Sequence, residues 1–516
     1  MPPLNSLPAL ELAGDRDLVW AIVRRTAVAA AIVGFAVVLG ASVHSSGKTE
    51  LELVGAAAVL VVAIRRIEVA YVALALAGVI LVGRLGVGDW TYLAAFTSGI
   101  VALRELARRR RPVLPTVLLL YGAWFLVASA TNGSATGGRR HFLVNYLVPP
   151  LLALATAAAA RDARVRRWIV AILLVAGLVE AGAVYFQAIA HGAAADTVTG
   201  TFGPSTANII AVVLMLPATV FFAMAVERVW RPKLMLLLAF ALPLCGVLSQ
   251  GRAIFALVPV AFGAVGLSYG FSATRSRGAR RALVAIFAVV VATPLLVVVY
   301  EGLFPTGLQG LTSLSGIESY LQQQNPGGAL PQRGVQLKTA LDLSTSGGPF
   351  TALAGRGVGA TRLLAGGVAN PATADETVGS LITATDSNDL APFVTPEQAT
   401  SGIWFGQILT ETGWVGVLAF VALLADLIVL GRRTRERLPS GSLERALMVA
   451  LPGLAWLALI TSFYAPIFFE PEFNTFFWPL VGVCIAIAAS VKRQQEPGSA
   501  SRGRIIGIGL GYRRAE

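Results

Sequence analysis

The chain has 516 residues, of which 56% are hydrophobic and only 13% are charged, with a formal net charge of +13. A soluble chain carries about 25% charged residues, so the composition excludes a soluble enzyme and a disordered protein. The two cysteines, Cys245 and Cys484, lie inside apolar runs, which excludes a disulfide scaffold and a cysteine-based metal site. The composition is that of a multi-pass membrane protein, in which the placement of positive charges matters more than their sum.

Apolar runs recur along the whole chain, and each is long enough, or nearly so, to cross a hydrocarbon core about 30 Å thick. The chain is therefore predicted to be an all-α polytopic membrane protein with about fourteen transmembrane helices. The first run follows Asp15 and Asp17, so a cleavable signal peptide is not expected. The predicted spans are 26–43, 50–64, 67–83, 89–103, 112–130, 142–160, 168–189, 208–226, 234–249, 253–272, 282–300, 403–430, 446–463 and 475–491.

The basic residues alternate between the connecting segments as the positive-inside rule requires, which predicts that both termini are cytoplasmic. Most of the 41 Lys and Arg residues fall in the segments predicted to be inside. The charge is thus a topology signal, and a nucleic-acid partner is not expected. The nine basic residues on the outer side need another explanation: Lys48, Arg84, Arg139, Arg140, Arg252, Arg333, Lys338, Arg356 and Arg362.

Residues 301–402 separate the eleventh and twelfth spans and contain no spanning run. A connection this long is typically a lid, a binding loop or a disordered segment. Two stretches in it, Leu314–Gln324 and Pro331–Leu343, are predicted to be helical, and the GRGVG segment at 355–359 to be a flexible turn. The predicted organisation is a cytoplasmic segment (1–25), eleven spans (26–300), a large extracytoplasmic loop (301–402), three spans (403–491) and a basic, disordered cytoplasmic tail (492–516).

Arginines on the outer side are the first candidates for chemistry. Arg252 lies in a short hairpin between two spans, and Arg333 opens the second loop helix. Each is interpreted either as a clamp for phosphate, which a guanidinium binds through paired donors, or as a structural residue. The structural alternative is an interfacial anchor for Arg252 and a solvated helix residue for Arg333. The same two interpretations apply to Arg139 and Arg140.

Carboxylates inside predicted spans are the second set. Glu180 lies near the middle of the seventh span and Glu411 near the start of the twelfth, and an ionisable residue in a span is by default a functional candidate. The alternatives are an interhelical hydrogen bond to a Ser or Tyr for Glu180, and the capping or orientation of loop residues for Glu411. His141, in an outer loop, is either a structural hydrogen-bonding residue or a base.

Four segments in order resemble the O-antigen ligase and O-antigen polymerase superfamily of bacterial envelope glycosyltransferases. The first is GTFGP at residues 200–204, followed by Asn208, and the second is SQGR at 249–252. The third is Arg333 followed by GRGVG at 355–359. The fourth consists of Gln407, Glu411, Gly413 and Gly416, which match the family's Gln…Glu-x-Gly…Gly pattern.

The resemblance implies a type C glycosyltransferase-like fold in the bacterial plasma membrane. It implies transfer of glycan from an undecaprenyl-pyrophosphate donor to an acceptor hydroxyl on the outer side, without a metal or other cofactor. Arg252 and Arg333 would hold the pyrophosphate and stabilise its charge, with Glu411 and Glu180 as further catalytic candidates. The expected partners are the lipid-linked donor, a glycan or lipid-linked acceptor, membrane lipids and envelope-glycan assembly proteins. The expected substrate-binding residues are Arg139, Arg140, His141, Asn208, Arg356 and Gln407.

The chain departs from the family at one position. Where the family places a His-Asn pair nine residues before the Glu of Glu-x-Gly, this chain has Gly402 and Ile403. Either another group acts as the base (Glu411, Glu180, Asp386, Asp389 or His141), or the reaction relies mainly on positioning and stabilisation of the leaving group, or the chemistry is different; a displaced carboxylate base is favoured. Two alternatives are kept: a transporter or flippase for lipid-linked glycan, which predicts paired broken helices, and a catalytically inert member that organises an envelope-glycan complex.

Overall fold

The structure is a computed structural model of the full chain, divided into two compact units, Met1–Leu74 and Ala75–Glu516. All residues that it describes belong to the second unit. They are residues 124, 146, 148–191, 198–201, 207–249, 253–270, 286, 289–291, 293–300, 332–346, 348–357, 403–465, 467–469 and 471–495. This part of the chain is helical and contains no strand, as predicted.

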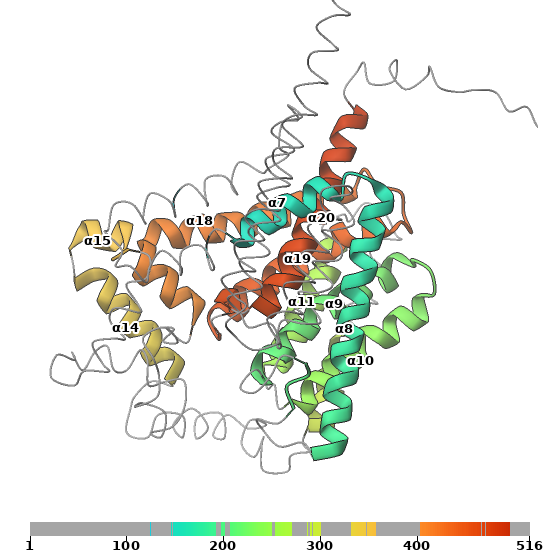
Figure 1. Cartoon of the computed structure of the whole chain (residues 1–516), viewed down its shortest axis with the longest axis horizontal. Coiled ribbons are helices and arrows are strands. Elements are labelled where there is room, and N and C mark those ends of the chain that lie inside the picture. The colour runs from blue at the N-terminus through green and yellow to red at the C-terminus, as the bar shows by residue number, and fades with distance from the viewer. Residues whose placement is uncertain are drawn as a thin grey trace, which may run out of the picture. The chain divides into compact units, whose positions relative to one another are not determined.

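The described helices follow the predicted spans from residue 148 onward (Figure 1). They are α7 (Val148–Ala159), α8 (Ala163–His191), α9 (Ala207–Glu227), α10 (Pro232–Leu248), α11 (Ile254–Gly270), α14 (Gln332–Ser346), α15 (Pro349–Ala354), α18 (Trp404–Arg435), α19 (Leu443–Ser462), the 3₁₀ turn η3 (Ile467–Phe469) and α20 (Pro471–Gln495). A further helical stretch covers Val289–Tyr300.

Five of the described helices, α8, α9, α18, α19 and α20, are long and apolar enough to cross a membrane. The chain is therefore a multi-pass α-helical membrane protein. Apart from Trp124, the predicted spans before residue 142 lie outside the described residues, as do most of the predicted outer loop and the predicted helix Leu314–Gln324. The second predicted loop helix is present as α14.

Several predicted boundaries differ from the structure by up to five residues. Helix α8 begins five residues before the predicted span, α18 continues to Arg435, and α20 begins at Pro471. Hydropathy ends a predicted span at the first charged residues, but the helices continue through them. The first turn of α8 carries exposed Arg164 and Arg167, whose side chains reach solvent while the backbone stays helical.

Helix α9 lies at the centre of the described helices and packs against α8, α10, α11, α19 and α20. It is apolar on every face, and residues 210–216 are completely buried, as expected of a helix surrounded by other helices. Pro217 interrupts its hydrogen-bond ladder. Gly177 of α8 accommodates this proline, because a Cβ there would lie 2.5 Å from the Pro217 ring.

Glycines allow close helix crossings elsewhere, as is common in membrane helices. A Cβ on Gly431 of α18 would lie 2.7 Å from the Met448 carbonyl of α19, and one on Gly453 of α19 would lie 2.7 Å from the Ala261 carbonyl of α11. Neither position has room for a larger side chain. These contacts fix the order α18, α19, α11 across one part of the bundle.

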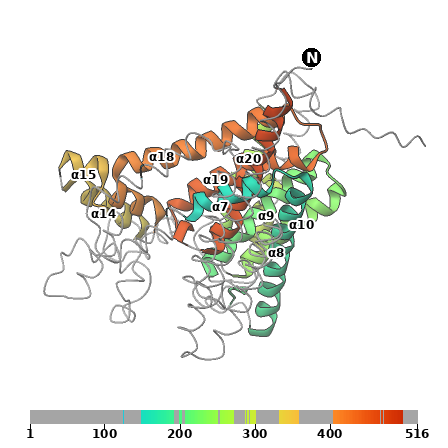
Figure 2. The same cartoon turned by 45° about the horizontal axis from the view of Figure 1, so that its top comes forward.

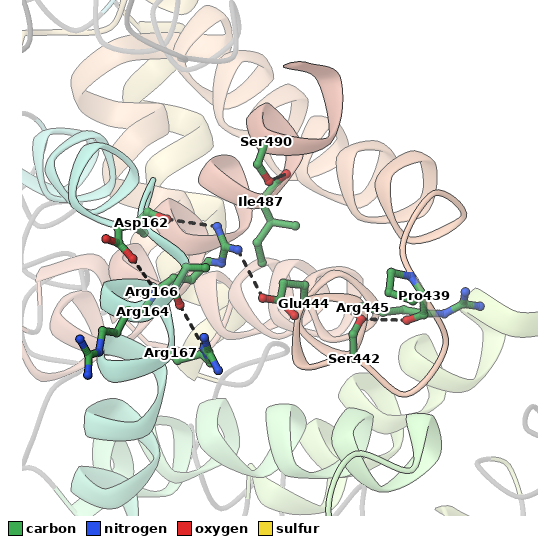
Figure 3. A network of polar contacts seen from close by, with 12 residues as sticks. Asp162, Arg164, Arg166, Arg167, Pro439, Ser442, Glu444, Arg445, Ile487 and Ser490 are labelled. Atoms are coloured by element: carbon green, nitrogen blue, oxygen red, sulfur yellow. Dashed lines mark hydrogen bonds and ion pairs between the residues drawn. The ribbon is translucent and has the colours of Figure 1, made fainter. Parts of the chain in front are cut away.

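A buried polar network lies at the helix ends that are predicted to be cytoplasmic. The Glu227 carboxylate is fully buried and accepts hydrogen bonds from Arg445 Nε at 2.9 Å and Tyr269 Oη at 2.5 Å. In the neighbouring pair, Arg166 of α8 contacts Glu444 of α19 at 3.3 Å (Figure 3). Because buried charges need partners, these pairs fix the ends of α8, α9 and α19 relative to one another.

Substitution of Arg445 tests the importance of this network. Arg445→Met leaves the Glu227 carboxylate buried without its cation, so we expect a loss of about 3 kcal/mol in the free energy of unfolding in detergent. Glu227→Gln is expected to cost less, because Arg445 is partly exposed. The exposed Arg164→Met serves as control and should unfold like the wild type. Equal stability of Arg445→Met and the control would contradict the assignment.

Candidate functional site

Helix α18 is broken at Gly413, whose φ of 65° and ψ of −169° are not helical. A break removes amide partners from the carbonyls of the preceding turn, here Thr410, Glu411 and Thr412. All three residues are fully buried. Inside a membrane protein an unpaired carbonyl is costly, so irregular backbone is tolerated only where other groups restore its hydrogen bonds.

The segment that follows α15 restores these hydrogen bonds. The backbone amide of Arg356 donates to the Thr410 carbonyl at 2.9 Å, and that of Gly357 donates to the Glu411 carbonyl at 3.0 Å. Trp124 Nε1 donates to the Thr412 carbonyl at 3.3 Å. The loop is thus attached to the broken helix by its backbone, and α15 and α14 pack beside α18 (Figure 2).

Two glycines make this junction possible. A Cβ on Gly413 would lie 2.3 Å from the Leu353 carbonyl oxygen, and a Cβ on Gly355 would lie 2.4 Å from the Glu411 carbonyl oxygen. Gly413 and Gly355 also have positive φ angles, 65° and 76°, which residues with a side chain rarely adopt. Glycine is therefore required at both positions by space and by backbone conformation.

Alanine at either glycine should open the junction. We expect Gly413→Ala and Gly355→Ala to lower the free energy of unfolding in detergent by about 2 kcal/mol or more, because the backbone conformation alone costs about 1–2 kcal/mol. Gly263→Ala, in α11, is the matched control: its Cβ would meet nothing within 4 Å, and alanine favours helix. Equal stabilities of the three variants would contradict this geometry.

Glu411 lies in the last turn of the first half of α18, two residues before Gly413, and is fully buried. Its Oε2 accepts from Tyr146 Oη at 2.6 Å, and its Oε1 accepts from Gln407 Nε2 at 3.0 Å. Gln407 is four residues earlier on the same helix face, so these two side chains meet as the sequence spacing allows. The carboxylate therefore connects α18 to the segment before α7, while the backbone carbonyl of Glu411 binds the segment after α15.

Removal of the Tyr146 hydroxyl tests this connection. Tyr146→Phe leaves one oxygen of a buried carboxylate without this donor, and we expect it to cost about 1–3 kcal/mol in thermal unfolding experiments. Tyr185→Phe, on the exposed face of α8, is the control and should be neutral. If both variants unfold at the wild-type temperature, the hydrogen bond to Glu411 contributes nothing.

An aromatic cluster holds the first turns of α18 and α20 together. The Phe468 ring of η3 lies within 5.2 to 5.9 Å of five neighbouring rings. Trp404, the first residue of α18, also contacts Tyr146, with ring centroids 5.4 Å apart. The five rings around Phe468 are those of Trp404, Phe420, Phe473, Phe477 and Trp478.

Glu180 of α8 binds the segment that carries the first motif of the resemblance. Its Oε1 accepts from the hydroxyl of Thr201 and its Oε2 from the backbone amide of Thr201 at 2.9 Å. About two turns further along α8, Gln187 accepts hydrogen bonds from the backbone amides of Thr199 and Gly200. Its side-chain amide donates to the Gly200 carbonyl at 2.6 Å. Two α8 side chains therefore fix the start of the GTFGP segment.

The structure brings together four of the predicted site residues in two places. Arg356, Gln407 and Glu411 belong to the junction at the α18 break, and Glu180 belongs to the Thr201 contact. The half-buried Arg356 side chain donates from Nε to the Leu343 carbonyl of α14 at 3.0 Å. This side-chain hydrogen bond connects two parts of the 301–402 segment.

The other predicted site residues are placed only in part. Arg333 lies in the first turn of α14 and Asn208 in the first turn of α9, but their side chains lie outside the described residues. Arg252, Arg139, Arg140 and His141 lie wholly outside them. The predicted approach of Arg252 to Arg333 therefore stays a prediction.

Sequence reasoning missed two residues of the junction, Tyr146 and Trp124, and also the buried Glu472 of α20. Tyr146 and Trp124 lie in apolar segments, and Glu472 lies at the start of the last span. Tyrosine and tryptophan carry a polar group that seeks a partner when buried, which is a weak signal without knowledge of that partner. Glu472 resembles an ordinary acidic residue in the first turn of a helix.

Comparison with protein-family models gives no match, and no curated protein matches the chain. In the described part of the chain, no three His, Cys, Asp or Glu side chains gather in a way that could hold a metal ion. The chemistry of the described site is that of buried carboxylates, amide groups and a phenol.

Proposed function

We propose that the chain is a membrane glycosyltransferase that polymerises or ligates undecaprenyl-pyrophosphate-linked oligosaccharide on the outer face of the bacterial plasma membrane. In this proposal about fourteen spans place both termini in the cytoplasm and the 301–402 segment outside. The observation that carries it is the junction at Gly413. Two motifs of the family resemblance, about fifty residues apart, meet there through backbone hydrogen bonds of Arg356 and Gly357.

In the proposed reaction the acceptor hydroxyl attacks the anomeric carbon of the donor sugar. The bond from that carbon to the pyrophosphate oxygen breaks, and undecaprenyl pyrophosphate leaves as the hydroxyl proton passes to a base. Arg252 and Arg333 would bind the leaving pyrophosphate and stabilise its charge. The outer loop would exclude water from the reacting sugar, and its attachment to α18 supports that role.

Glu411 fits a positioning role in this reaction. Both of its oxygens accept hydrogen bonds, and the residue is fully buried. The Glu411 side chain would hold the first half of α18 against Tyr146, and the Glu411 backbone carbonyl would hold the loop through Gly357. This supports the interpretation that Glu411 orients loop residues, with proton transfer left to another group of the predicted set.

The transporter alternative draws support from the break in α18, because transporters use unwound helices to bind substrate and ions. In such sites the freed carbonyls face the cargo. Here the carbonyls of Thr410 and Glu411 already accept amide hydrogen bonds from the outer loop, which favours a fixed junction over a transport site. The inert-member alternative rests on Gly402 at the family's His position.

Substitution of the two arginines tests the proposed function. We expect Arg252→Ala and Arg333→Ala each to abolish formation of longer or transferred glycan at normal membrane levels, because each removes a phosphate donor from the site. Lys338→Ala, an exposed position of the same helix α14 as Arg333, is the matched control and should keep full activity. The measurement is the ladder of glycan products on gels.

The same assay separates the alternatives. Near-normal ladders from both arginine variants would contradict the pyrophosphate assignment. Wild-type protein that moves labelled lipid-linked oligosaccharide across liposome membranes, without forming a glycosidic bond, would favour the transporter. Wild-type protein that does neither would favour the inert organising role.

A further inference from the structure

Helices α14 and α15, both in the 301–402 segment, expose opposite kinds of side chain. Among the described residues of α14, the exposed ones are Lys338, Asp342 and Thr345, which are polar and lie on one face of the helix. Helix α15 instead exposes two large apolar side chains, with Phe350 67% exposed and Leu353 56% exposed. These two residues are three positions apart and share a face. Water suits the exposed face of α14, whereas an apolar surrounding stabilises the pair on α15.

The exposed face of α15 is fixed relative to the break in α18. The chain turns between α14 and α15 at Gly348, whose φ is 89°, and the Gly348 carbonyl accepts a hydrogen bond from the Ala352 amide at 3.0 Å. At the other end of α15, the Leu353 carbonyl lies against Gly413, so closely that a Cβ on Gly413 would be 2.3 Å from its oxygen. The direction in which Phe350 and Leu353 point is therefore set by the junction.

The part of α18 that follows the break is long enough to cross a membrane by itself. Residues 414–435 rise about 33 Å at about 1.5 Å per residue, compared with about 30 Å for the hydrocarbon core. Basic residues in the last turn mark one end and Trp414 marks the other, as expected where tryptophan gathers at the boundary between membrane and water. A stripe of exposed apolar residues runs along one face between these ends, and in a spanning helix this face meets lipid. The stripe consists of Trp414, Leu418, Val421, Ala425 and Val429.

Helix α15 packs against α18 at the Trp414 end of this stripe (Figure 2). The Leu353 carbonyl contacts Gly413, the residue before Trp414, so α15 lies at the depth where the spanning part of α18 begins. At this depth a helix with large apolar side chains on its exposed face is partly buried in lipid. The apolar pair on α15 continues the lipid-facing surface of α18, and this continuity indicates that lipid covers the pair.

We propose that α15 anchors the 301–402 segment to the membrane surface, with Phe350 and Leu353 inserted among the acyl chains of phospholipids at the end of α18 opposite its basic last turn. With the predicted topology this is the outer leaflet. The polar face of α14 stays in water. The segment is then held on one side by its backbone hydrogen bonds to α18 and on the other side by lipid. This inference goes beyond the proposed function and does not depend on it.

The test is photolabelling of the full chain in liposomes of phosphatidylethanolamine and phosphatidylglycerol, with a phospholipid that carries a trifluoromethyl-aryl diazirine in its acyl chain. On illumination the diazirine loses nitrogen, and the resulting carbene inserts into a neighbouring C–H bond. Trypsin releases most of both exposed faces in one peptide, residues 339–356, in which fragment-ion spectra locate the label. We expect label on Phe350 and Leu353 at a yield similar to that on Leu418, and none on Thr345.

Substitution of the apolar pair separates lipid from other partners of this face. The double variant Phe350→Gln, Leu353→Gln changes only exposed side chains, so it should stay folded in detergent, lose the label on α15 and keep that on Leu418. Thr345→Gln, on the polar face of α14, is the matched control and should keep the wild-type pattern. A wild-type chain labelled at Leu418 but not on α15 would show that another protein segment or a second copy covers the face, and would overturn the proposal. Undiminished α15 label in the folded double variant would overturn it as well.

Discussion

The break in α18 at Gly413 is the constraint on which the described site depends. A membrane helix satisfies its own backbone groups, so a break in its interior requires partners from elsewhere. Here those partners are the amides of Arg356 and Gly357 and the indole of Trp124. The helix therefore depends on the segment after α15 for its shape, and that segment is fixed in turn by the helix.

The same principle organises the rest of the described helices. Buried carboxylates serve as connections between separate segments of the chain. Glu411 connects α18 to Tyr146, Glu180 connects α8 to Thr201, and Glu227 connects α9 to Arg445. Because an unpaired buried charge is expensive, these few contacts specify how apolar helices, which could pack in many ways, pack in one.

The sequence predicted most of the described architecture, since long apolar runs report directly on membrane helices. The runs from 142 onward appear as helices with errors of a few residues at their ends, and the second loop helix is present as α14. Gln407 and Glu411, which the sequence analysis singled out as members of one motif, are in contact in the structure. The break itself was not predicted, because hydropathy is averaged over the run at 403–430 and is insensitive to a positive φ at Gly413. Nor could local sequence identify Tyr146 as the partner of Glu411, since they are 265 residues apart.

The most direct test of this account is amide hydrogen exchange of the loop segment 353–357 in the full chain in nanodiscs. The backbone amides of Arg356 and Gly357 donate to buried carbonyls of α18, so the account predicts that they exchange slowly, at rates comparable to those of helix α18 itself. It also predicts that Gly413→Ala accelerates their exchange and leaves that of α11 unchanged. Rapid exchange of both amides in the wild type would contradict the claim that the loop completes the broken helix.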